Sequence, residues 1–439
     1  MTPRGIIIAA PGSSSGKTTV TLGLLRLLKR LGYRAGSAKV GPDYVDPGFH
    51  EAASGEPCLN LDLWAMRPDT FADAVARAEG AHDVVVAEGV MGLFDGATID
   101  TGSTADVAAA TGWPVVLVVD AGGMASSAAA VVHGFATFRS DVTVAGVIYN
   151  RCGSARHEAI LREATAALNI PVIGALPRSD TMMLPSRHLG LVLAQEHQEL
   201  HDFLEGVADV LESHIDVESL LSLAAPGRVQ PRLVDAPIPM LGQRIAIARD
   251  LAFAFVYPLT IDAWRMSGAS TTFFSPLNNE PPDPTADAVF LPGGYPELHA
   301  GTLAGNHKFW NGLRRAAQQG ACVYAECGGY MALGETLIDA QGEAHRMAGL
   351  LPVSTTFAQR KLTLGYRDAV LVGDSKLGER GDQFRGHEFH FSQIEGSLGA
   401  AEALFECSDA RGNAMGSFGQ RRNNVMGSFV HLIDRVALP

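Results

Sequence analysis

The chain has 439 residues, of which 47% are hydrophobic, 18% charged and 7% aromatic, a composition typical of globular α/β enzymes and not of disordered or fibrous chains. At about 150 residues per domain, this length predicts two or three domains, and we favour two. The net charge of −13 argues against binding of nucleic acid or anionic membranes through a basic surface. Five cysteines without a CxxC pair predict reduced thiols in a cytoplasmic protein and no zinc site.

The amino-terminal half alternates short apolar runs with amphipathic segments. The run at residues 5–10 is too short for the core of a signal peptide, so we interpret it as the first buried strand. No run approaches the roughly 20 residues that cross a membrane. Helices are expected at 18–31 and 155–168, and further strands at 35–39, 83–89, 114–121, 144–150 and 171–177. This alternation predicts a mostly parallel sheet covered by helices.

The loop after the first strand has the composition of a phosphate-binding loop, "AAPGSSSGKTT". Lys17 would reach the β and γ oxygens of a nucleotide, and Thr18 would help to hold Mg²⁺. The loop departs from the usual pattern because Pro11 stands where the first glycine is expected, with Gly12 one place late. A Gly/Ser-rich turn without a ligand is the alternative. The pattern predicts an ATP site made by Gly12, Ser13, Ser15, Gly16, Lys17, Thr18 and Thr19.

Acidic residues follow two of the predicted strands. Glu88 ends "DVVVAE" and is expected to face the nucleotide as a magnesium ligand, with Asp95 seven residues later; either would otherwise be a solvated surface acid. Asp43 and Asp46 lie three apart in the loop "AKVGPDYVDPGFH". Such a pair suits magnesium binding or positioning of a nucleophile beside the γ-phosphate. Aspartate next to proline also caps turns, so both interpretations of the pair stay open.

The second half of the chain opens after a proline-rich segment. Residues 195–223 are expected to be helical, and the stretch that follows carries four prolines without a helix or strand period. We therefore predict a linker at 223–242 between a domain at 1–222 and a domain at 243–439. Apolar runs recur in "RIAIARD", "ADAVFLPGG", "ACVYAECGG" and the closing "NVMGSFVHLI", which predicts a second α/β domain.

Cys327 stands between the apolar run "ACVYA" and the helix-like "GGYMAL". A cysteine at a strand-to-helix corner projects from the carboxyl edge of a sheet, where the N–H groups of the next helix favour the thiolate. Gly328 and Gly329 would let a substrate approach closely. The alternative is a buried structural thiol, which is the commoner role of a free cysteine.

Seven segments in this order resemble the cobyrinic and hydrogenobyrinic acid a,c-diamide synthases: "SSSGKTT", "KVGPDYVDPGFH", "VAEGVMGLFDG", "LPGGYPE", "ECGGYMAL", "GHEFHFS" and "GSFVHLI". The resemblance covers essentially the whole chain. It implies an amino-terminal P-loop ATPase domain similar to dethiobiotin synthetase and a carboxyl-terminal class I glutamine amidotransferase domain, both α/β. It also implies that ATP and glutamine are used to convert the a and c acetate carboxylates of hydrogenobyrinic or cobyrinic acid to amides.

The resemblance assigns roles to individual residues. Cys327 is the expected nucleophile that releases ammonia from glutamine, and His431 its base and acid. Class I amidotransferases commonly carry an acid two residues after the histidine. That place is Ile433 here, and Asp434 would point the other way on a strand, so a Cys–His dyad is expected. Asn150 would read adenine, although asparagine also ends strands in turns. The remaining roles are the oxyanion donors Gly294, Tyr295 and Gly328, and the macrocycle-binding Tyr44, Asp46, Asp95, Arg178 and Arg187.

Three alternatives accompany this interpretation. Glu388 and His390 in "GHEFHFS" share one strand face; we favour a structural or domain-interface role over a metal pair, because the cysteine mechanism needs no metal. Cobyric acid or nickel-sirohydrochlorin would be amidated by the same chemistry. A regulatory or DNA-partitioning ATPase would need a second lysine in the loop and a basic face, and neither occurs. Neither a nucleic-acid nor a membrane partner is expected, and a homodimer is compatible with the sequence.

Overall fold

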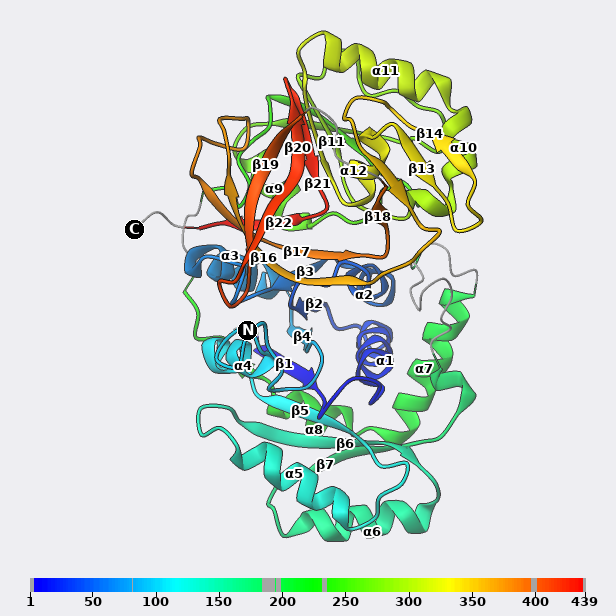
Figure 1. Ribbon diagram of the computed structural model, residues 1–439. Helices are drawn as coiled ribbons and strands as arrows, with labels where there is room; N and C mark the ends of the chain where they lie inside the picture. Colours follow the sequence, from blue (N-terminus) through cyan, green and yellow to red (C-terminus); the bar gives the residue numbers. More distant parts are fainter. Residues whose placement is uncertain are drawn as a thin grey trace. The chain divides into compact units, whose positions relative to one another are not determined.

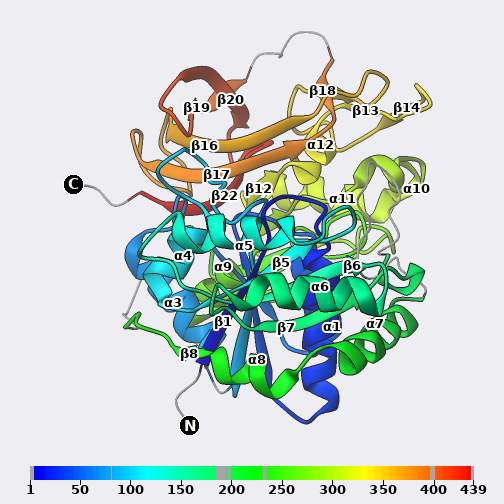
Figure 2. The same ribbon diagram turned by 90° about the horizontal axis from the view of Figure 1, so that it is seen from below.

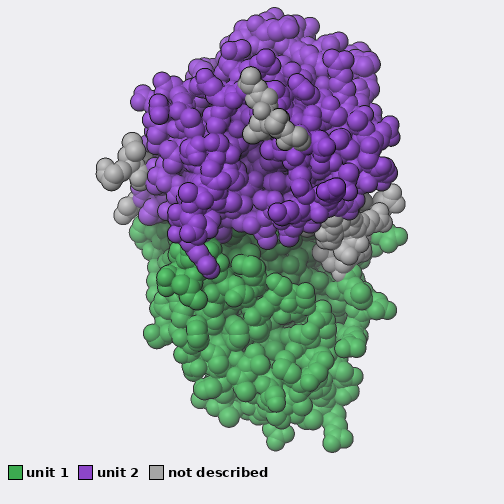
Figure 3. All heavy atoms as spheres, in the orientation of Figure 1, with its two compact units in different colours: residues 1–64, 71–233 green, residues 65–70, 234–439 purple. Residues whose placement is uncertain are grey.

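The computed structural model describes residues 4–80, 82–183, 194, 199–230, 235–395 and 401–436. The chain divides into two compact units, one of residues 1–64 and 71–233 and the other of residues 65–70 and 234–439 (Figure 3). The division after residue 233 falls within the segment that we predicted as a linker. The start of that segment is structured, since helix α8 (Val217–Leu223) is followed by strand β8 (Ala225–Pro226), which pairs with β1 (Arg4–Ala9).

A parallel sheet forms the centre of the first unit (Figure 1). Its strand order is β3-β2-β4-β1-β5-β6-β7, with only β8 antiparallel. Strand β3, "CLNL", was not predicted because it is short and carries an asparagine, and the two-residue β8 was not predicted either. Besides β1 and β8, the strands of this sheet are β2 (Ala35–Val40), β3 (Cys58–Leu61), β4 (Val84–Glu88), β5 (Val115–Asp120), β6 (Val144–Cys152) and β7 (Val172–Pro177).

Helices cover both faces of this sheet (Figure 2). They are α1 (Lys17–Arg30), α2 (Asp46–Ser54), α3 (Pro68–Glu79), α4 (Thr104–Thr111), α5 (Ser127–Thr137), α6 (Ala155–Ala166) and α7 (Leu200–His214). Helix α1 packs against α2 and α7, whereas α5 packs against α6. Because parallel crossovers are right-handed, helices whose connections run toward β3 and toward β7 lie on opposite faces. The winding direction changes beside β1, and ligands of such sheets bind at the carboxyl ends of the strands near this change.

The second unit contains a ten-stranded sheet in the order β10-β9-β11-β12-β21-β20-β19-β16-β17-β22 and a four-stranded sheet in the order β14-β13-β15-β18. The first five strands of the larger sheet are parallel and the rest antiparallel. Buried residues of β11 and β12 alternate between two cores, with Val289 and Val323 in one and Phe290 and Tyr324 in the other. Both faces of these strands are therefore covered, as in parallel α/β sheets.

The elements of the second unit have the following bounds. The strands are β9 (Arg244–Ala248), β10 (Ser270–Phe274), β11 (Ala288–Leu291), β12 (Cys322–Glu326), β13 (Thr336–Ile338), β14 (Ala344–Arg346), β15 (Ser354–Thr356), β16 (Thr363–Leu371), β17 (Gln383–His390), β18 (Gln393–Ile394), β19 (Glu402–Asp409), β20 (Ala414–Arg422), β21 (Val425–Ser428) and β22 (His431–Arg435). The helices are α9 (Pro258–Met266), α10 (Ala300–Gly305), α11 (His307–Gln318) and α12 (Gly328–Leu333).

Two features of this unit differ from the sequence prediction. The closing run "NVMGSFVHLI" is not one strand, because β21 pairs with β12 and β20 whereas β22 pairs with β17. The segment 65–70 belongs to this unit, where the Arg67 side chain binds Asp434 with Nε 3.0 Å from Oδ1. Among the described residues, the helices include none long and apolar enough to cross a bilayer.

Candidate active sites

The phosphate-binding loop connects β1 to α1, and Lys17 is the first residue of the helix. Ser14 and Gly16 have positive φ angles of 64° and 87°. The Asn150 amide, from β6, donates to the Ser15 carbonyl at 2.9 Å. A Cβ atom on Gly16 would lie 2.2 Å from the Asn150 Nδ2 atom, so this position requires glycine for both its backbone angle and its neighbour.

Replacement of Gly16 by alanine is expected to weaken ATP use selectively. The strain of a positive φ in a non-glycine residue, about 1–3 kcal/mol, and the collision with Asn150 should raise the KM for ATP about tenfold or more. Gly134→Ala in α5 is the matched control, because no atom lies within 4 Å of its added methyl group. Steady-state kinetics would compare the two variants, and a normal KM for ATP in Gly16→Ala would contradict this account of the loop.

A cleft of about 690 Å³ adjoins the phosphate-binding loop, a size that suits a nucleotide. Ser14, Gly16, Lys17, Thr18 and Thr19 line one side, and the ends of β5, β6 and β7 contribute Asp120, Asn150 and Arg178. The structure thus brings Arg178, predicted to bind the macrocycle, to the same cleft as the loop. Arg187, predicted for the same role, lies outside the described residues.

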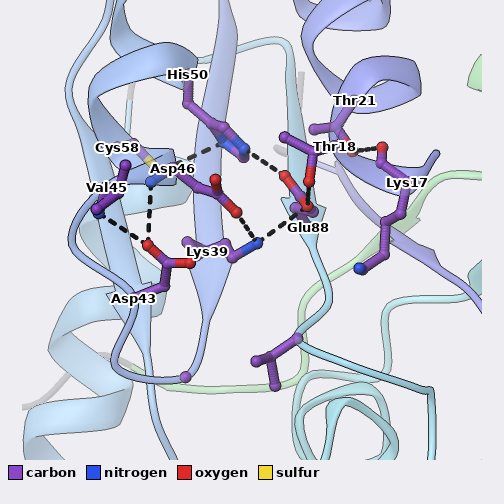
Figure 4. Close-up of polar contacts among 12 residues, drawn as sticks. Lys17, Thr18, Thr21, Lys39, Asp43, Val45, Asp46, His50, Cys58 and Glu88 are labelled. Carbon is purple, nitrogen blue, oxygen red and sulfur yellow. Dashed lines mark hydrogen bonds and ion pairs between the residues drawn. The ribbon is translucent and has the colours of Figure 1, made fainter. Parts of the chain in front are cut away.

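A buried polar network joins the ends of β2 and β4 to the start of α1 (Figure 4). Lys39 and Glu88 are register partners on adjacent parallel strands, so their side chains leave the sheet together. The Lys39 ammonium lies 2.9 Å from Glu88 Oε1 and donates to Asp46 Oδ2 at 2.5 Å. Thr18 donates to Glu88 Oε1 at 2.6 Å, and His50 Nε2 lies 2.7 Å from Glu88 Oε2. The predicted magnesium ligands Thr18 and Glu88 are therefore in contact.

Burial and charge together set the protonation of this network. Burial opposes the ionised form of Glu88, but Lys39 and His50 outweigh it and hold the pKa of Glu88 well below its usual range. Burial and the neighbouring Asp43 raise the pKa of Asp46 to about 6. Burial also lowers the pKa of Lys17, while Glu88 acts in the opposite direction. Removal of Lys39 would leave two carboxylates without their buried cation, a change that typically costs about 3–5 kcal/mol.

The two paired aspartates have different local roles. Asp43 Oδ1 accepts from the backbone N–H groups of Val45 and Asp46 at 2.8 and 3.0 Å, which is the turn-capping arrangement considered above. Asp46 is not in a loop as we predicted, because it is the first residue of α2, where its charge also favours the helix N-terminus. Its carboxylate points to Lys39 in Figure 4. Because Oδ1 of Asp43 caps the turn, Oδ2 is the carboxylate oxygen that could bind a ligand.

The remaining predicted residues of this unit lie around the network and the loop. Tyr44, which lies between Asp43 and Asp46 in the sequence, is buried. Asp95 is exposed, and its Oδ2 atom accepts a hydrogen bond from the Gly92 N–H at 2.9 Å. Ser13 is exposed, and Ser15 is buried and donates to the Gly12 carbonyl at 3.0 Å. Sequence reasoning missed Lys39 and His50. The position of Lys39 at the end of an apolar strand, like that of Glu88, was the available signal.

The second candidate site lies at the carboxyl ends of β11, β12 and β21. Cys327 follows β12 directly and has φ 47° and ψ −109°, a strained backbone conformation that suits the sharp turn of a nucleophile between a strand and a helix. Its N–H donates to the Ser428 carbonyl at 2.8 Å, and its own carbonyl accepts from Met331 at 3.1 Å. The corner predicted from the sequence is therefore present and is fixed from both sides.

His431 and the glycine loop after β11 meet this cysteine. A Cβ atom on Gly293 would lie 2.9 Å from His431 Nε2 and 3.2 Å from Cys327 Cβ, so the nucleophile and the base converge on one glycine. A Cβ atom on Gly328 would lie 3.0 Å from the Gly294 nitrogen. Tyr295, the next predicted donor, is buried and precedes the short helix at Pro296–Leu298. The predicted oxyanion residues thus lie together beside Cys327.

Burial favours the neutral forms of both Cys327 and His431. Burial raises the pKa of the Cys327 thiol well above its ordinary value, and the nearby Glu297 carboxylate adds to this effect. Burial also lowers the pKa of His431 to about 3, with smaller contributions from His387 and His390. The Gly328 N–H favours the thiolate, as expected from the sequence, but desolvation acts against it and is the larger effect.

Glu388 and His390 are hydrogen-bonded within the second unit, and Glu388 is buried. Glu388 Oε1 lies 3.1 Å from His390 Nε2, and Oε2 accepts from Arg367 Nε at 2.7 Å. The His390 ring stacks on Phe429 with a centroid separation of 4.0 Å. These contacts satisfy the carboxylate from both sides and agree with the structural role that we favoured over a metal pair.

Comparison with known proteins bears on both sites. Residues 6–192 match the family of the CobQ/CobB/MinD/ParA nucleotide binding domain, and residues 244–435 match the CobB/CobQ-like glutamine amidotransferase domain. A hydrogenobyrinate a,c-diamide synthase of Brucella anthropi is 52% identical over 433 residues, which cover 98% of each chain. The protein of the same name from Rhizobium meliloti is 52% identical over 435 residues, 98% of this chain and 99% of that one. This chain belongs to the hydrogenobyrinate a,c-diamide synthase family.

A third relative of that name, from Mesorhizobium japonicum, is 48% identical over 441 residues and covers both chains fully. The resemblance stated from seven short segments is thereby confirmed. The predicted fold class is also confirmed, with a P-loop nucleotide-binding domain followed by a class I amidotransferase-like domain. Membership of this family places the chain among ATP-dependent, glutamine-hydrolysing amide ligases, and it disfavours a regulatory or partitioning ATPase.

Proposed function

We propose that this protein converts the a and c acetate carboxylates of hydrogenobyrinic acid to amides, with glutamine as the nitrogen donor and ATP as the activating reagent. The observation that carries the proposal is the match over 98% of each chain to a relative named for this activity. The residues expected for each half-reaction also lie together in the structure. Lys17, Thr18 and Glu88 converge in the first unit, and Cys327 and His431 converge in the second.

The first unit would activate the carboxylate. A carboxylate is a poor electrophile because its charge repels electron-rich nucleophiles. Transfer of the γ-phosphoryl group to a carboxylate oxygen forms an acyl phosphate and releases ADP; ammonia then attacks the acyl carbon and phosphate leaves. Lys17 would neutralise charge on the transferred group, and the N–H groups at the start of α1 would hold the phosphates.

The donor atoms at this site fit a magnesium ion. The Thr18 hydroxyl and the Glu88 carboxylate are hard oxygen ligands in contact, beside the lysine of the loop. Mg²⁺ typically binds one or two such protein oxygens together with phosphate oxygens and water, and it supplies charge neutralisation during phosphoryl transfer. Asp43, through the oxygen that does not cap the turn, is the third proposed ligand. Lys39 and His50 would hold Glu88 in the orientation that this role requires.

The second unit would release ammonia from glutamine. His431 takes the Cys327 thiol proton, and the thiolate attacks the side-chain amide carbon. N–H groups of Gly294, Tyr295 and Gly328 would stabilise the oxyanion, and His431 would return the proton to the departing ammonia. Water then hydrolyses the thioester to glutamate and regenerates the thiol. Neutral ammonia produced in this way avoids protonation in solvent, where ammonium is not a nucleophile.

The cobalt-free macrocycle is the proposed acceptor, because the relatives are named for hydrogenobyrinate. Mass analysis tests this choice. Purified protein with ATP and glutamine would receive hydrogenobyrinic acid, cobyrinic acid or cobyric acid in separate reactions. Diamide formation from hydrogenobyrinic acid with the highest kcat/KM is expected. A higher kcat/KM for cobyric acid would contradict the proposal and would show that this protein amidates a different tetrapyrrole by the same chemistry.

Asp43→Asn and Asp46→Asn distinguish a catalytic role from turn capping. Asparagine can keep the cap and the helix start, so turnover would hardly change if capping were the only role. Loss of a charge at the reacting centre instead costs about 10²-fold or more in rate. We expect both variants to fold and to hydrolyse glutamine, but to fail in amide formation. Excess Mg²⁺ should partly rescue Asp43→Asn and should not rescue Asp46→Asn.

Asp100→Asn provides the control for this pair, because Asp100 is an exposed aspartate of the same unit. It should retain full synthesis, measured as diamide formed per minute with ammonia as donor. Wild-type turnover in both Asp43→Asn and Asp46→Asn would return the loop to a purely structural role.

A further inference from the structure

The side chain of Glu326 lies beside the base of the proposed glutaminase site. Glu326 is the last residue of β12, directly before Cys327, and its side chain is buried. Its Oε2 atom lies 3.6 Å from His431 Nδ1. Its Oε1 atom accepts from the Tyr324 hydroxyl at 2.8 Å and from the Leu432 N–H at 3.0 Å. The carboxylate is thus fixed by its own strand and by β22, which also carries His431.

The two nitrogens of the His431 ring face different groups. Nε2 lies beside Gly293, which also adjoins Cys327, whereas Nδ1 lies on the side of Glu326. A base that takes a proton at Nε2 must carry its own proton at Nδ1, and an acceptor at Nδ1 selects this tautomer. The separation of 3.6 Å is slightly long for a hydrogen bond, and such contacts commonly shorten when the substrate is bound.

Other acids near the end of the chain are engaged elsewhere. The place two residues after His431 is held by Ile433, which is buried in the core. Asp434 receives two hydrogen bonds from Arg67, one from the backbone N–H at 2.7 Å and one from Nε at 3.0 Å. Glu388 is paired with Arg367 and His390. The sequence neighbours of the histidine therefore do not supply the acid that orients it.

We propose that Glu326 is the positioning residue for His431. Its carboxylate accepts the Nδ1 proton, holds Nε2 toward the Cys327 thiol, and stabilises the imidazolium that forms when the thiol proton is transferred. The acid of the site then precedes the nucleophile in the chain instead of following the histidine. This inference rests on the proposed glutaminase function of Cys327 and His431.

The charge states of the two groups suit this role. Burial raises the pKa of Glu326 to about 7, while the Leu432 N–H and the Tyr324 hydroxyl favour its anion. Above that pH the carboxylate is ionised beside a neutral imidazole. Proton transfer from Cys327 converts this contact to an ion pair inside a buried site, where a charge-assisted hydrogen bond is stronger than in water.

The test compares Glu326→Gln with Glu326→Asp and with Asp434→Asn, which alters a buried acid on β22 outside the site. In Glu326→Gln, glutaminase kcat should fall about 10²-fold or more, since the base loses its oriented tautomer. The KM for glutamine should change less than about threefold, because loss of transition-state stabilisation alone lowers kcat without altering ground-state binding. Glu326→Asp should recover part of the loss, and Asp434→Asn should keep the wild-type kcat. Synthesis with ammonia as donor should persist in every variant.

Two further variants make the outcome decisive. Tyr324→Phe removes one hydrogen bond that holds Glu326 and should lower glutaminase kcat several-fold; it replaces Glu326→Gln if that protein does not fold. A wild-type kcat in Glu326→Gln, or in Tyr324→Phe in its place, would overturn the inference. Glutaminase activity in Cys327→Ala would instead overturn the proposed nucleophile. An inactive Cys327→Ala together with a normal Glu326→Gln would refute only the role of Glu326.

Discussion

Cys327→Ala is expected to abolish glutamine-dependent amide formation and to leave ammonia-dependent formation largely intact. The thiol is the only proposed covalent nucleophile for the glutamine amide, whereas the phosphate-binding loop and Glu88 belong to a separate compact unit. Serine should not replace the cysteine, because its hydroxyl lacks the nucleophilicity of a thiolate. Diamide yield measured with each nitrogen donor gives the result directly.

Cys322→Ala is the matched control for this experiment. Cys322 is the first residue of β12, the strand that Cys327 follows; it is buried in the core, and burial raises the pKa of its thiol to about 12. Its removal should cost some stability through a small cavity and should leave both activities in place. Equal loss of synthesis with glutamine and with ammonia in Cys327→Ala would contradict a separate glutaminase site.

Lys17→Ala is expected to abolish synthesis with either nitrogen donor. Positioning and charge neutralisation supply most of the catalysis of phosphoryl transfer, so the rate should fall about 10²-fold or more. Glu88→Gln should have the same effect, because it removes the charge that Thr18, Lys39 and His50 surround. Glutamine hydrolysis itself should survive in both variants.

Lys29→Ala, on the exposed side of the same helix, should retain full synthesis and serves as the control. The products of the wild-type reaction provide a second check, since activation by phosphoryl transfer yields ADP and phosphate. Detection of AMP and pyrophosphate would show that the carboxylate is activated by adenylation and would contradict the assignment of Lys17.

Much of the first site could be predicted because its signals are local in sequence. An apolar run, a Gly/Ser-rich loop and an amphipathic helix follow one another within thirty residues, and each has a strong structural preference. The contact between Lys39 and Glu88 could not be predicted in this way. The contact requires β2 to lie beside β4 with these two residues in register, and the order of strands in a sheet cannot be predicted from the sequence of a single segment.

Less of the second site could be predicted from the sequence. The corner at Cys327 was predicted from a buried strand and two glycines, but burial by residues from distant segments, which raises the pKa of its thiol, could not be predicted from these. The antiparallel strands β16, β19 and β20 were not predicted, since partly exposed positions such as Leu364, which is 57% exposed, weaken the apolar alternation. The acid beside His431 was sought two residues after the histidine, whereas folding brings Glu326 from another strand.

Transfer of nitrogen from glutamine to the macrocycle is the most direct measurement of the coupled reaction. Purified protein, ATP, Mg²⁺ and hydrogenobyrinic acid would be incubated with glutamine carrying ¹⁵N in its side-chain amide, in buffer that contains unlabelled ammonium. We predict that mass spectrometry will find ¹⁵N in both new amides, with one glutamate and one ADP formed for each. Product that carries nitrogen only from the ammonium would contradict the coupling of Cys327 to the ATP-dependent site.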